Sequence, residues 1–397
     1  MEKGFNIMFK KTDQELEKMG AIITTREIQQ QPKLWQEAFD NYTAKKSEID
    51  NFLDKVTSTF PNQKIRVIFT GAGTSAYVGD TLRPYLNRAG DTSHFVFETI
   101  PTTDIVSAPL DNLRSDDPTI LVSFARSGNS PESVATVELA EKLIKNLYQI
   151  TITCAPEGHL ATKAENEDGN LLLLQPALSN DKGFAMTGSF SCMTLTAALI
   201  FDTSDEAKKA AWVDTMIKMG DEVISREDEI QAYADLDYDR ITYLGSGSLS
   251  GLTREAQLKV LELTAGALTT IFDSSMGFRH GPKSYVNGKT IVFDFMGNDK
   301  YTRQYDVDIL EEIKADEICE KVVGVGTSDD NDFSGDNFFI KAGDKDLPEL
   351  YQALPDVVFA QTFALMNSIK VNNTPDTPSA SGTVNRVVKG VTIHDYE

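Results

Sequence analysis

The chain has 397 residues, of which 41% are hydrophobic and 25% charged, a composition typical of a globular protein with room for two domains. Its net charge of −22 argues against nucleic acid or a membrane surface as a partner, so a phosphorylated ligand would need local Lys, Arg or backbone N–H groups. Three scattered cysteines argue against a disulfide framework and a zinc site. The sequence has no apolar run of membrane-spanning length and no signal-peptide pattern, which predicts a cytoplasmic protein.

The first half of the chain alternates short β-branched runs with amphipathic helical patterns. Residues 1–45 predict a helical N-terminal extension. Residues 46–203 predict a first domain. Its expected strands are 66–70, 94–97, 119–124 and 149–154, with a helix over 132–147.

The second half has the same alternation. Residues 204–371 predict a helical bridge, 204–237, and a second domain. The expected strands of that domain are 240–244, 267–272, 290–295 and 321–326, with a helix over 248–264. Residues 372–397 are rich in Pro, Ser, Thr and Asn, and predict an irregular C-terminal tail over the active site.

The two halves also resemble each other in sequence. The segment Arg66-Val-Ile-Phe-Thr-Gly-Ala-Gly-Thr-Ser is similar to Arg240-Ile-Thr-Tyr-Leu-Gly-Ser-Gly-Ser, at an offset of 174 residues. Two further matches follow in the same order at nearly the same offset, which indicates a duplicated domain. We therefore predict an α/β protein of two tandem domains. Each would be a mostly parallel sheet sandwiched by helices, a flavodoxin-like three-layer arrangement with ligands beyond the carboxyl ends of its strands.

The first glycine turn, residues 71–76, allows two interpretations. It fits the dinucleotide-binding pattern G-x-G-x-x-[GA], and Glu98 stands at a strand end downstream, as a nicotinamide enzyme would require. The alternative is a tight strand-to-helix turn without a ligand.

A stronger candidate for a phosphate site follows the third expected strand. Arg126, Ser127, Gly128 and Ser130 precede a helix that would begin at Pro131, so hydroxyls, backbone N–H groups and one guanidinium converge at a helix N-terminus. The alternative is ordinary helix capping. The matching place in the second half, residues 295–299, lacks hydroxyl and basic groups.

The second half carries the candidate acid–base groups. Glu255, Lys259 and Glu262 fall on one face of the helix expected over 248–264, a pattern that is usually a solvated ion-pair stripe. His280 lies with Arg279 and Lys283 in a segment whose composition predicts a loop. A lone loop histidine is usually a surface group, but the adjacent cations and Gly-Pro favour a functional role.

These motifs together resemble the SIS (sugar isomerase) family. Gly71-x-Gly-Thr-Ser, Ser127-Gly-Asn-Ser, Glu255-x-x-x-Lys-x-x-Glu and Phe278-Arg-His-Gly-Pro occur in the order found in the isomerase half of glucosamine-6-phosphate synthase. Segments 273–284 and 381–388 are similar to the signatures of tagatose-6-phosphate ketose/aldose isomerases, also described as galactosamine-6-phosphate deaminases. The resemblance covers residues 45–393 and implies two tandem SIS domains.

The resemblance also implies a role for each matching residue. Glu262 would move a proton between C1 and C2, Lys259 would stabilise the enolate, and His280 would open the sugar ring, acting from a second subunit. The residues expected to bind the substrate and its phosphate are Gly73, Thr74, Ser75, Arg126, Ser127, Gly128, Ser130, Glu255 and Lys389. Two features depart from the synthase pattern: Ala125-Arg126 replaces Ser-Gln, and the spacing from Glu262 to His280 is longer.

The expected activity is deamination with isomerisation of a hexosamine 6-phosphate, galactosamine 6-phosphate above all, to tagatose 6-phosphate and ammonia. No metal or other cofactor is expected, because carboxylate, ammonium and imidazole groups supply the proton transfers. A homodimer or larger homo-oligomer with a shared active site is expected. The alternatives are a ketose/aldose isomerase that releases no ammonia, and a sugar-phosphate-sensing regulatory module.

Overall fold

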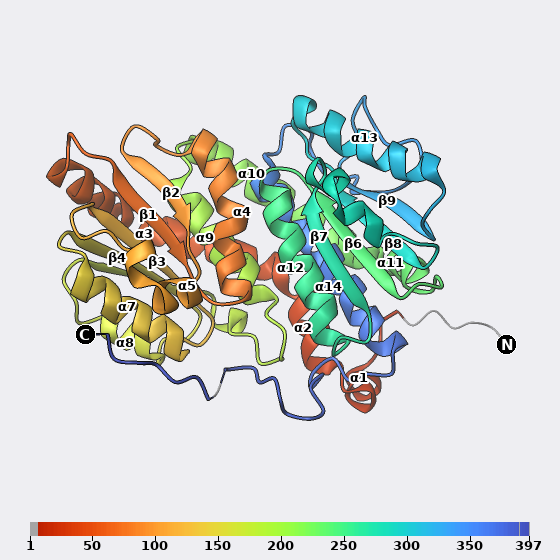
Figure 1. The fold of residues 1–397 in the computed structure, drawn as a ribbon, viewed down its shortest axis with the longest axis horizontal. Helices are drawn as coiled ribbons and strands as arrows, with labels where there is room; N and C mark the ends of the chain where they lie inside the picture. The colour runs from red at the N-terminus through yellow and green to blue at the C-terminus, as the bar shows by residue number, and fades with distance from the viewer. Residues whose placement is uncertain (1–6, 389, 397) are drawn as a thin grey trace. The chain divides into compact units, whose positions relative to one another are not determined.

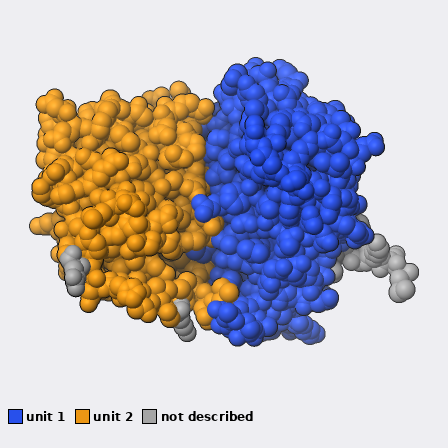
Figure 2. All heavy atoms as spheres, viewed as in Figure 1, with its two compact units in different colours: residues 1–33, 182–187, 210–383 blue, residues 34–181, 188–209, 384–397 orange. Residues whose placement is uncertain are grey.

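The structure is a computed structural model that describes residues 7–388 and 390–396 (Figure 1). The chain divides into two compact units that are interleaved in sequence (Figure 2). Unit 1 takes its described residues from 1–33, 182–187 and 210–383, and unit 2 from 34–181, 188–209 and 384–397. The predicted N-terminal helices are present as α1 (Asp13–Met19), α2 (Ile22–Gln29) and α3 (Gln31–Thr59).

Unit 2 is built on a five-stranded parallel sheet with the order β2-β1-β3-β4-β5. The strands are β1 (Ile65–Thr70), β2 (Phe95–Thr99), β3 (Thr119–Ala125), β4 (Leu147–Thr153) and β5 (Asn170–Leu174). The main connecting helices are α4 (Thr74–Ala89), α5 (Thr102–Ser107), α7 (Pro131–Leu143), α8 (His159–Ala164) and α9 (Gly188–Phe201), with a short α6 (Pro109–Asn112).

Successive side chains of a strand point to opposite faces, and both faces of this sheet are covered. Ile68 and Leu121 pack with Val137 of α7 and Leu160 of α8 in one core cluster. On the other face Phe69 packs edge-to-face against Phe201 of α9. Helices therefore cover both faces of this sheet, the layer arrangement predicted for the first half.

Unit 1 repeats this architecture, with the strand order β10-β9-β8-β6-β7. The strands are β6 (Arg240–Gly245), β7 (Thr269–Ser274), β8 (Thr290–Phe295), β9 (Lys321–Gly326) and β10 (Asp336–Phe339). The helices are α10 (Glu206–Ser225), which begins in unit 2, then α11 (Glu227–Ala234), α12 (Ser248–Leu263), α13 (Lys300–Asp316) and α14 (Glu349–Lys370).

The core of unit 1 also has two layers. Val292 packs with Leu310 of α13, whereas Phe293 packs with Phe363 of α14. In each sheet the second strand in chain order, β2 or β7, lies at the edge beside the first strand, β1 or β6. The third strand, β3 or β8, lies on the other side of the first. This shared topology confirms the predicted duplication.

The structure corrects two details of the expected elements. All eight expected strands are present, but β5 and the four-residue β10 were not predicted. The expected helix over 132–147 ends at Leu143, because Ile144 is already extended and β4 begins at Leu147. Across residues 7–388 and 390–396, no helix combines the length and apolar character that crossing a bilayer requires.

Candidate functional site

The glycine turn after β1 is tightly closed. A Cβ on Gly71 would lie 2.6 Å from Cβ of Ser75, and Gly73 has a φ of +56°, so both positions favour glycine. Thr74 and Ser75 begin α4 and are buried. The turn thus carries Thr74 and Ser75 into the start of α4, beyond the carboxyl end of β1.

The acidic residue that a dinucleotide site would need is already engaged. Nε and Nη2 of Arg66 each donate to one carboxylate oxygen of Glu98, both at 2.7 Å. This bidentate ion pair accounts for the position of Glu98 without a ribose. The geometry therefore favours the sugar-phosphate interpretation of this turn over the nicotinamide one.

The predicted phosphate loop lies between β3 and α7, on the strand next to β1. Gly128 has a φ of +66°, and its carbonyl accepts from N of Leu160 at 3.1 Å. Asn129 Oδ1 accepts from N of His159 at 2.9 Å. A Cβ on Gly158 would lie 2.4 Å from O of Ser127, so α8 can approach only because that position is glycine. The loop is thus held against the start of α8, at the switch point of the sheet, where α/β proteins bind ligands.

The two serines of this loop are partly exposed. Ser130 is the N-cap of α7 and Pro131 occupies the first helical position, as predicted. Among the described residues, the Ser130 side chain makes no capping hydrogen bond, so helix capping does not account for its hydroxyl. Ser127 Oγ accepts from N of Asn129 at 3.3 Å, which leaves its hydrogen available to a ligand.

Arg126 connects the loop to the C-terminal tail. Its side chain is buried, and Nη2 donates to O of Arg386 at 2.6 Å. Arg386 in turn donates from Nε to O of Asp181 at 3.0 Å. The tail therefore packs beside the phosphate loop within unit 2. Lys389, the predicted tail lysine, lies outside the described residues.

Glu132 was not predicted as a site residue. It lies in the first turn of α7 and is 8% exposed, and within the described part of the chain its Oε2 has no hydrogen-bond partner. Acidic residues are common in the first turn of helices because they complement the helix dipole, so this burial could not be predicted from the residue type and its position.

The three predicted residues on α12 lie together. Nζ of Lys259 is 2.7 Å from Oε2 of Glu262 and 3.3 Å from Oε1 of Glu255. Glu255 and Lys259 are fully buried, while 24% of the Glu262 side chain is exposed. The solvated-stripe interpretation is therefore wrong, because Glu255 and Lys259 have no exposed side-chain surface.

The charge state of Lys259 follows from this geometry. Burial alone would lower the pKa of Lys259, but the charges of Glu255 and Glu262 and the hydrogen bonds to them outweigh it and raise that pKa. Lys259 is a fixed ammonium group, and Glu262 is the member of the three that a substrate can reach.

The segment that carries His280 is more ordered than its composition predicted. It forms two short 3₁₀ turns, Gly277–His280 and Pro282–Tyr285, and Phe278 is fully buried in the core cluster of α13. Arg279 Nε donates to Oε2 of Glu312 at 2.6 Å, and Lys283 pairs with the same glutamate. The two cations thus hold the loop to α13, while His280 itself is exposed.

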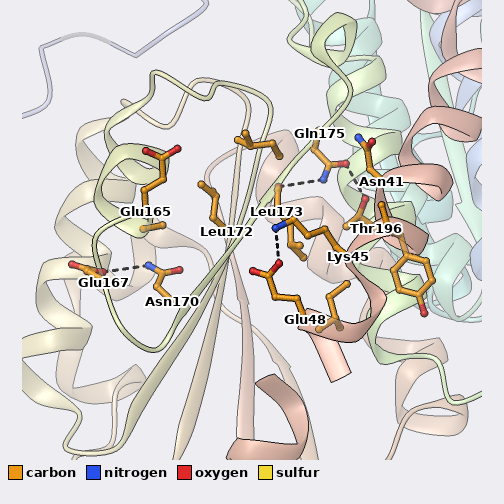
Figure 3. Close-up of a pocket in the computed structure, with 15 residues that line it drawn as sticks. Asn41, Lys45, Glu48, Glu165, Glu167, Asn170, Leu172, Leu173, Gln175 and Thr196 are labelled. Carbon is orange, nitrogen blue, oxygen red and sulfur yellow. Dashed lines mark hydrogen bonds and ion pairs between the residues drawn. The ribbon is translucent and has the colours of Figure 1, made fainter. Parts of the chain in front are cut away.

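A separate cavity of about 640 Å³ lies in unit 2 beside α3 and β5 (Figure 3). Lys45 and Glu48 form an ion pair there, and Glu165 and Glu167 add negative charge. None of the predicted site residues is among the described residues that line it. Its acidic lining does not suit a phosphate.

Comparison with known proteins agrees with the fold and the motifs. A family model described as the SIS domain matches residues 60–201. D-galactosamine-6-phosphate deaminase AgaS from Escherichia coli is 42% identical over 385 residues, which cover 94% of this chain and 96% of that protein.

Two solved structures are also similar. Tagatose-6-phosphate ketose/aldose isomerase from Escherichia coli has a TM-score of 0.83 and 38% identity, covering 94% of this chain and 96% of that one. A protein from Clostridium novyi NT has a TM-score of 0.91 and 40% identity, covering 97% of this chain and 98% of that one.

Two parallel sheets of equal strand order, each with a glycine turn after its first strand, define a protein of two tandem SIS domains. The chain belongs to the SIS family, in the group that contains AgaS.

Proposed function

We propose that this protein is an enzyme that deaminates and isomerises D-galactosamine 6-phosphate, giving tagatose 6-phosphate and ammonia. The observation that carries the proposal is 42% identity to D-galactosamine-6-phosphate deaminase AgaS across 94% of this chain. The buried lysine between two glutamates on α12 supports it, because proton transfer beside a carbonyl needs a base and a nearby cation.

The proposed chemistry starts from the open-chain amino sugar. Glu262 removes the proton from C2, and the electron pair moves toward the C1 oxygen, where the Lys259 ammonium offsets the developing negative charge. The C1 oxygen takes up a proton, which gives an enolamine. As Glu262 returns its proton to C1, the nitrogen lone pair forms the C2=N bond and the nitrogen gives up one proton, which leaves a ketimine at C2. Water adds to the C=N bond and ammonia leaves, so the product is the ketose. Glu255, whose side chain is fully buried, holds Lys259 in place.

We assign the phosphate to the loop between β3 and α7. Ser127 and Ser130 supply hydroxyl groups, and the N-terminus of α7 supplies partial positive charge. Gly128 lets the backbone approach the phosphate. The remaining proposed contacts are Gly73, Thr74, Ser75, Arg126 and Lys389.

We assign ring opening to His280, acting from a second copy of the chain. His280 is exposed, and β7 is an edge strand that pairs only with β6 in the described sheet. Phe272 on β7, Met276 just after it and Leu261 on α12, which packs against β7, are 41%, 47% and 41% exposed. An exposed edge with apolar side chains suits an interface between copies, so a homodimer or larger homo-oligomer is part of the proposal.

A second candidate is a ketose/aldose isomerase that acts on hexose 6-phosphates without releasing ammonia. The similarity to the tagatose-6-phosphate ketose/aldose isomerase structure favours it. The same proton transfer between C1 and C2 would serve both reactions, so the two differ only in the group on C2.

One experiment separates these functions. Purified protein is incubated with galactosamine, glucosamine, galactose and tagatose 6-phosphates, and ammonia and aldose–ketose conversion are measured together. Ammonia and ketose in equal amounts from galactosamine 6-phosphate are expected. Aldose–ketose interconversion of the nitrogen-free sugars alone would favour the second candidate. Failure to release ammonia from either hexosamine 6-phosphate would overturn the deaminase proposal.

A further inference from the structure

The β6–α12 turn of unit 1 repeats the backbone of the β1–α4 turn of unit 2. Gly247 has φ and ψ of +57° and −126°, and Gly73 has +56° and −129°. The offset between the two glycines is the 174 residues that relate the halves in sequence. Unit 1 therefore has its own switch point at the carboxyl ends of β6 and β8, in a sheet of the same topology.

In unit 1 a carboxylate of the chain itself lies at this place. Asp306 of α13 is fully buried, and its Oδ1 accepts from Oγ of Ser246 at 2.5 Å and from Oγ of Ser275 at 2.6 Å. Its Oδ2 accepts from N of Gly297 at 3.0 Å. Ser246 belongs to the glycine turn, Ser275 follows β7, and Gly297 follows β8. Two hydroxyls and one backbone N–H from three strand ends thus converge on one anion.

Ser275 is shared between two carboxyl groups, and its single hydrogen limits how both can be bound. Oγ of Ser275 also lies 3.0 Å from Oδ2 of Asp294, a fully buried residue on β8. A hydroxyl has one hydrogen, so Ser275 can donate to only one of the two carboxyl groups and must accept from the other. Burial, followed by the charge of Asp306, raises the pKa of Asp294 well above its usual range. A protonated Asp294 would donate to Ser275 and leave the hydrogen of Ser275 for an ionised Asp306.

The surrounding charge supports this assignment. Arg303 is 1% exposed and donates from Nη1 to O of Gly297 at 3.1 Å and from Nη2 to O of Thr327 at 3.0 Å. It therefore fixes the loop that presents N of Gly297 and places a guanidinium charge near Asp306. Burial raises the pKa of Asp306, while its hydrogen bonds and Arg303 act in the opposite direction.

We propose that unit 1 contains a binding site for a small oxyanion, formed by Ser246, Ser275 and N of Gly297, which the side chain of Asp306 occupies permanently. The site accepts a carboxylate or another small oxyanion when that side chain is removed. The proposed function assigns the phosphate to the β3–α7 loop of unit 2. On that basis each chain offers one site for an external phosphate, because Asp306 fills the site in unit 1. Asp306 is the seventh residue of α13, and the seventh residue of α7 in unit 2 is Val137, which follows Ala135 and Thr136; none of these three side chains is charged.

The test is rescue of stability by formate. Asp306→Ala removes the carboxylate that accepts from Ser246, Ser275 and N of Gly297, so its Tm in sodium chloride should fall by at least about 5 °C. Formate at tens of millimolar should recover at least half of that loss, relative to chloride at the same ionic strength. In Asp306→Asn the amide still fills the site, so formate should raise its Tm no more than chloride does.

A matched control removes general effects of formate. Leu310→Ala creates an apolar cavity under the same helix, which a charged ion does not enter. The proposal is overturned if Asp306→Ala is as stable as the natural chain, or if formate stabilises Leu310→Ala or Asp306→Asn equally. If Asp306→Ala does not fold in chloride, its refolding yield in formate is compared with that in chloride, and equal yields overturn the proposal.

This readout does not depend on the enzyme's activity. Loss of the proposed phosphate role of Ser127 would leave the formate rescue unchanged, and a failed rescue would leave the ammonia assay unchanged. The two proposals can therefore fail separately.

Discussion

Nζ of Lys259 lies 2.7 Å from Oε2 of Glu262, and the lysine is fully buried while the glutamate keeps 24% of its side chain exposed. The ammonium group is therefore shielded from solvent, and the carboxylate is partly exposed. This asymmetry separates the two roles, because the buried group stabilises charge and the accessible group can touch a substrate.

Replacing the accessible member should stop the reaction. In Glu262→Gln we expect turnover to fall by roughly 10²–10⁴-fold with KM nearly unchanged, because the amide keeps the shape but cannot accept a proton. Steady-state kinetics with galactosamine 6-phosphate measure this split. Turnover equal to that of the natural chain would refute the base assignment.

Replacing the buried member should affect stability as well. Lys259→Met leaves the fully buried Glu255 without its cation, and we expect the free energy of unfolding to drop by about 3–5 kcal/mol. Adding Glu255→Gln should recover part of that loss. Urea denaturation measures both. The exposed pair Lys218–Asp214 provides the control, since Lys218→Met should cost less than about 1 kcal/mol. A similar loss in both single variants would contradict the special role of the buried pair.

The phosphate loop should respond mainly in affinity. Ser127→Ala removes one hydrogen bond to the phosphate, and we expect KM to rise roughly 5- to 30-fold with kcat little changed. Ser107→Ala, an exposed serine elsewhere in unit 2, is the control. An effect confined to kcat would be incompatible with a phosphate contact.

Two inactive variants should complement each other if His280 acts across a subunit boundary. A mixed dimer of Glu262→Gln and His280→Ala contains one site with both natural residues. Random mixing should restore about a quarter of the natural activity, because half of the dimers are mixed and each has one intact site. Proven mixed dimers with no activity would place His280 in the site of its own chain.

The buried carboxyl group of Asp294 should make stability depend on pH. Its pKa is raised well above 3.8 in the folded protein, so the folded state keeps a proton that the unfolded state releases above about pH 4. Folding stability from this group therefore falls as pH rises. Asp294→Asn removes that dependence, and its stability relative to the natural chain should increase from pH 4 to pH 7 in urea titrations. Asp308→Asn, at an exposed position of α13, controls for charge loss. A constant difference between pH 4 and pH 7 would show that Asp294 is ionised in the folded state.

Much of the fold could be predicted from the sequence because each half independently shows the same alternation of short apolar runs and amphipathic helical patterns. The eight expected strands are short runs rich in apolar and β-branched residues, and those at 66–70 and 240–244 are each followed by a glycine turn. The two missed strands are short and lie at sheet edges: β10 has four residues, and β5 reads Asn-Leu-Leu-Leu-Leu, without alternation or β-branched residues.

The candidate site was less predictable, because burial and long-range pairing leave no local pattern. Asp306 lies among other acidic residues of an ordinary amphipathic helix, and its burial follows only from the packing of α13. In the sequence Arg279 and Lys283 favour a functional role for His280, but both pair with Glu312, which is 33 residues beyond Arg279. By contrast, the helical spacing of Glu255, Lys259 and Glu262 was sufficient to place these three side chains together.

The hydrogen bond from Arg126 to the carbonyl of Arg386 has a consequence for synthesis on the ribosome. The sheet of unit 2 is complete once residue 174 has emerged, but the phosphate loop acquires this partner only after more than two hundred further residues, including the strands of unit 1, have been translated. A nascent chain can therefore form the first sheet early, yet the native surroundings of Arg126 are completed last.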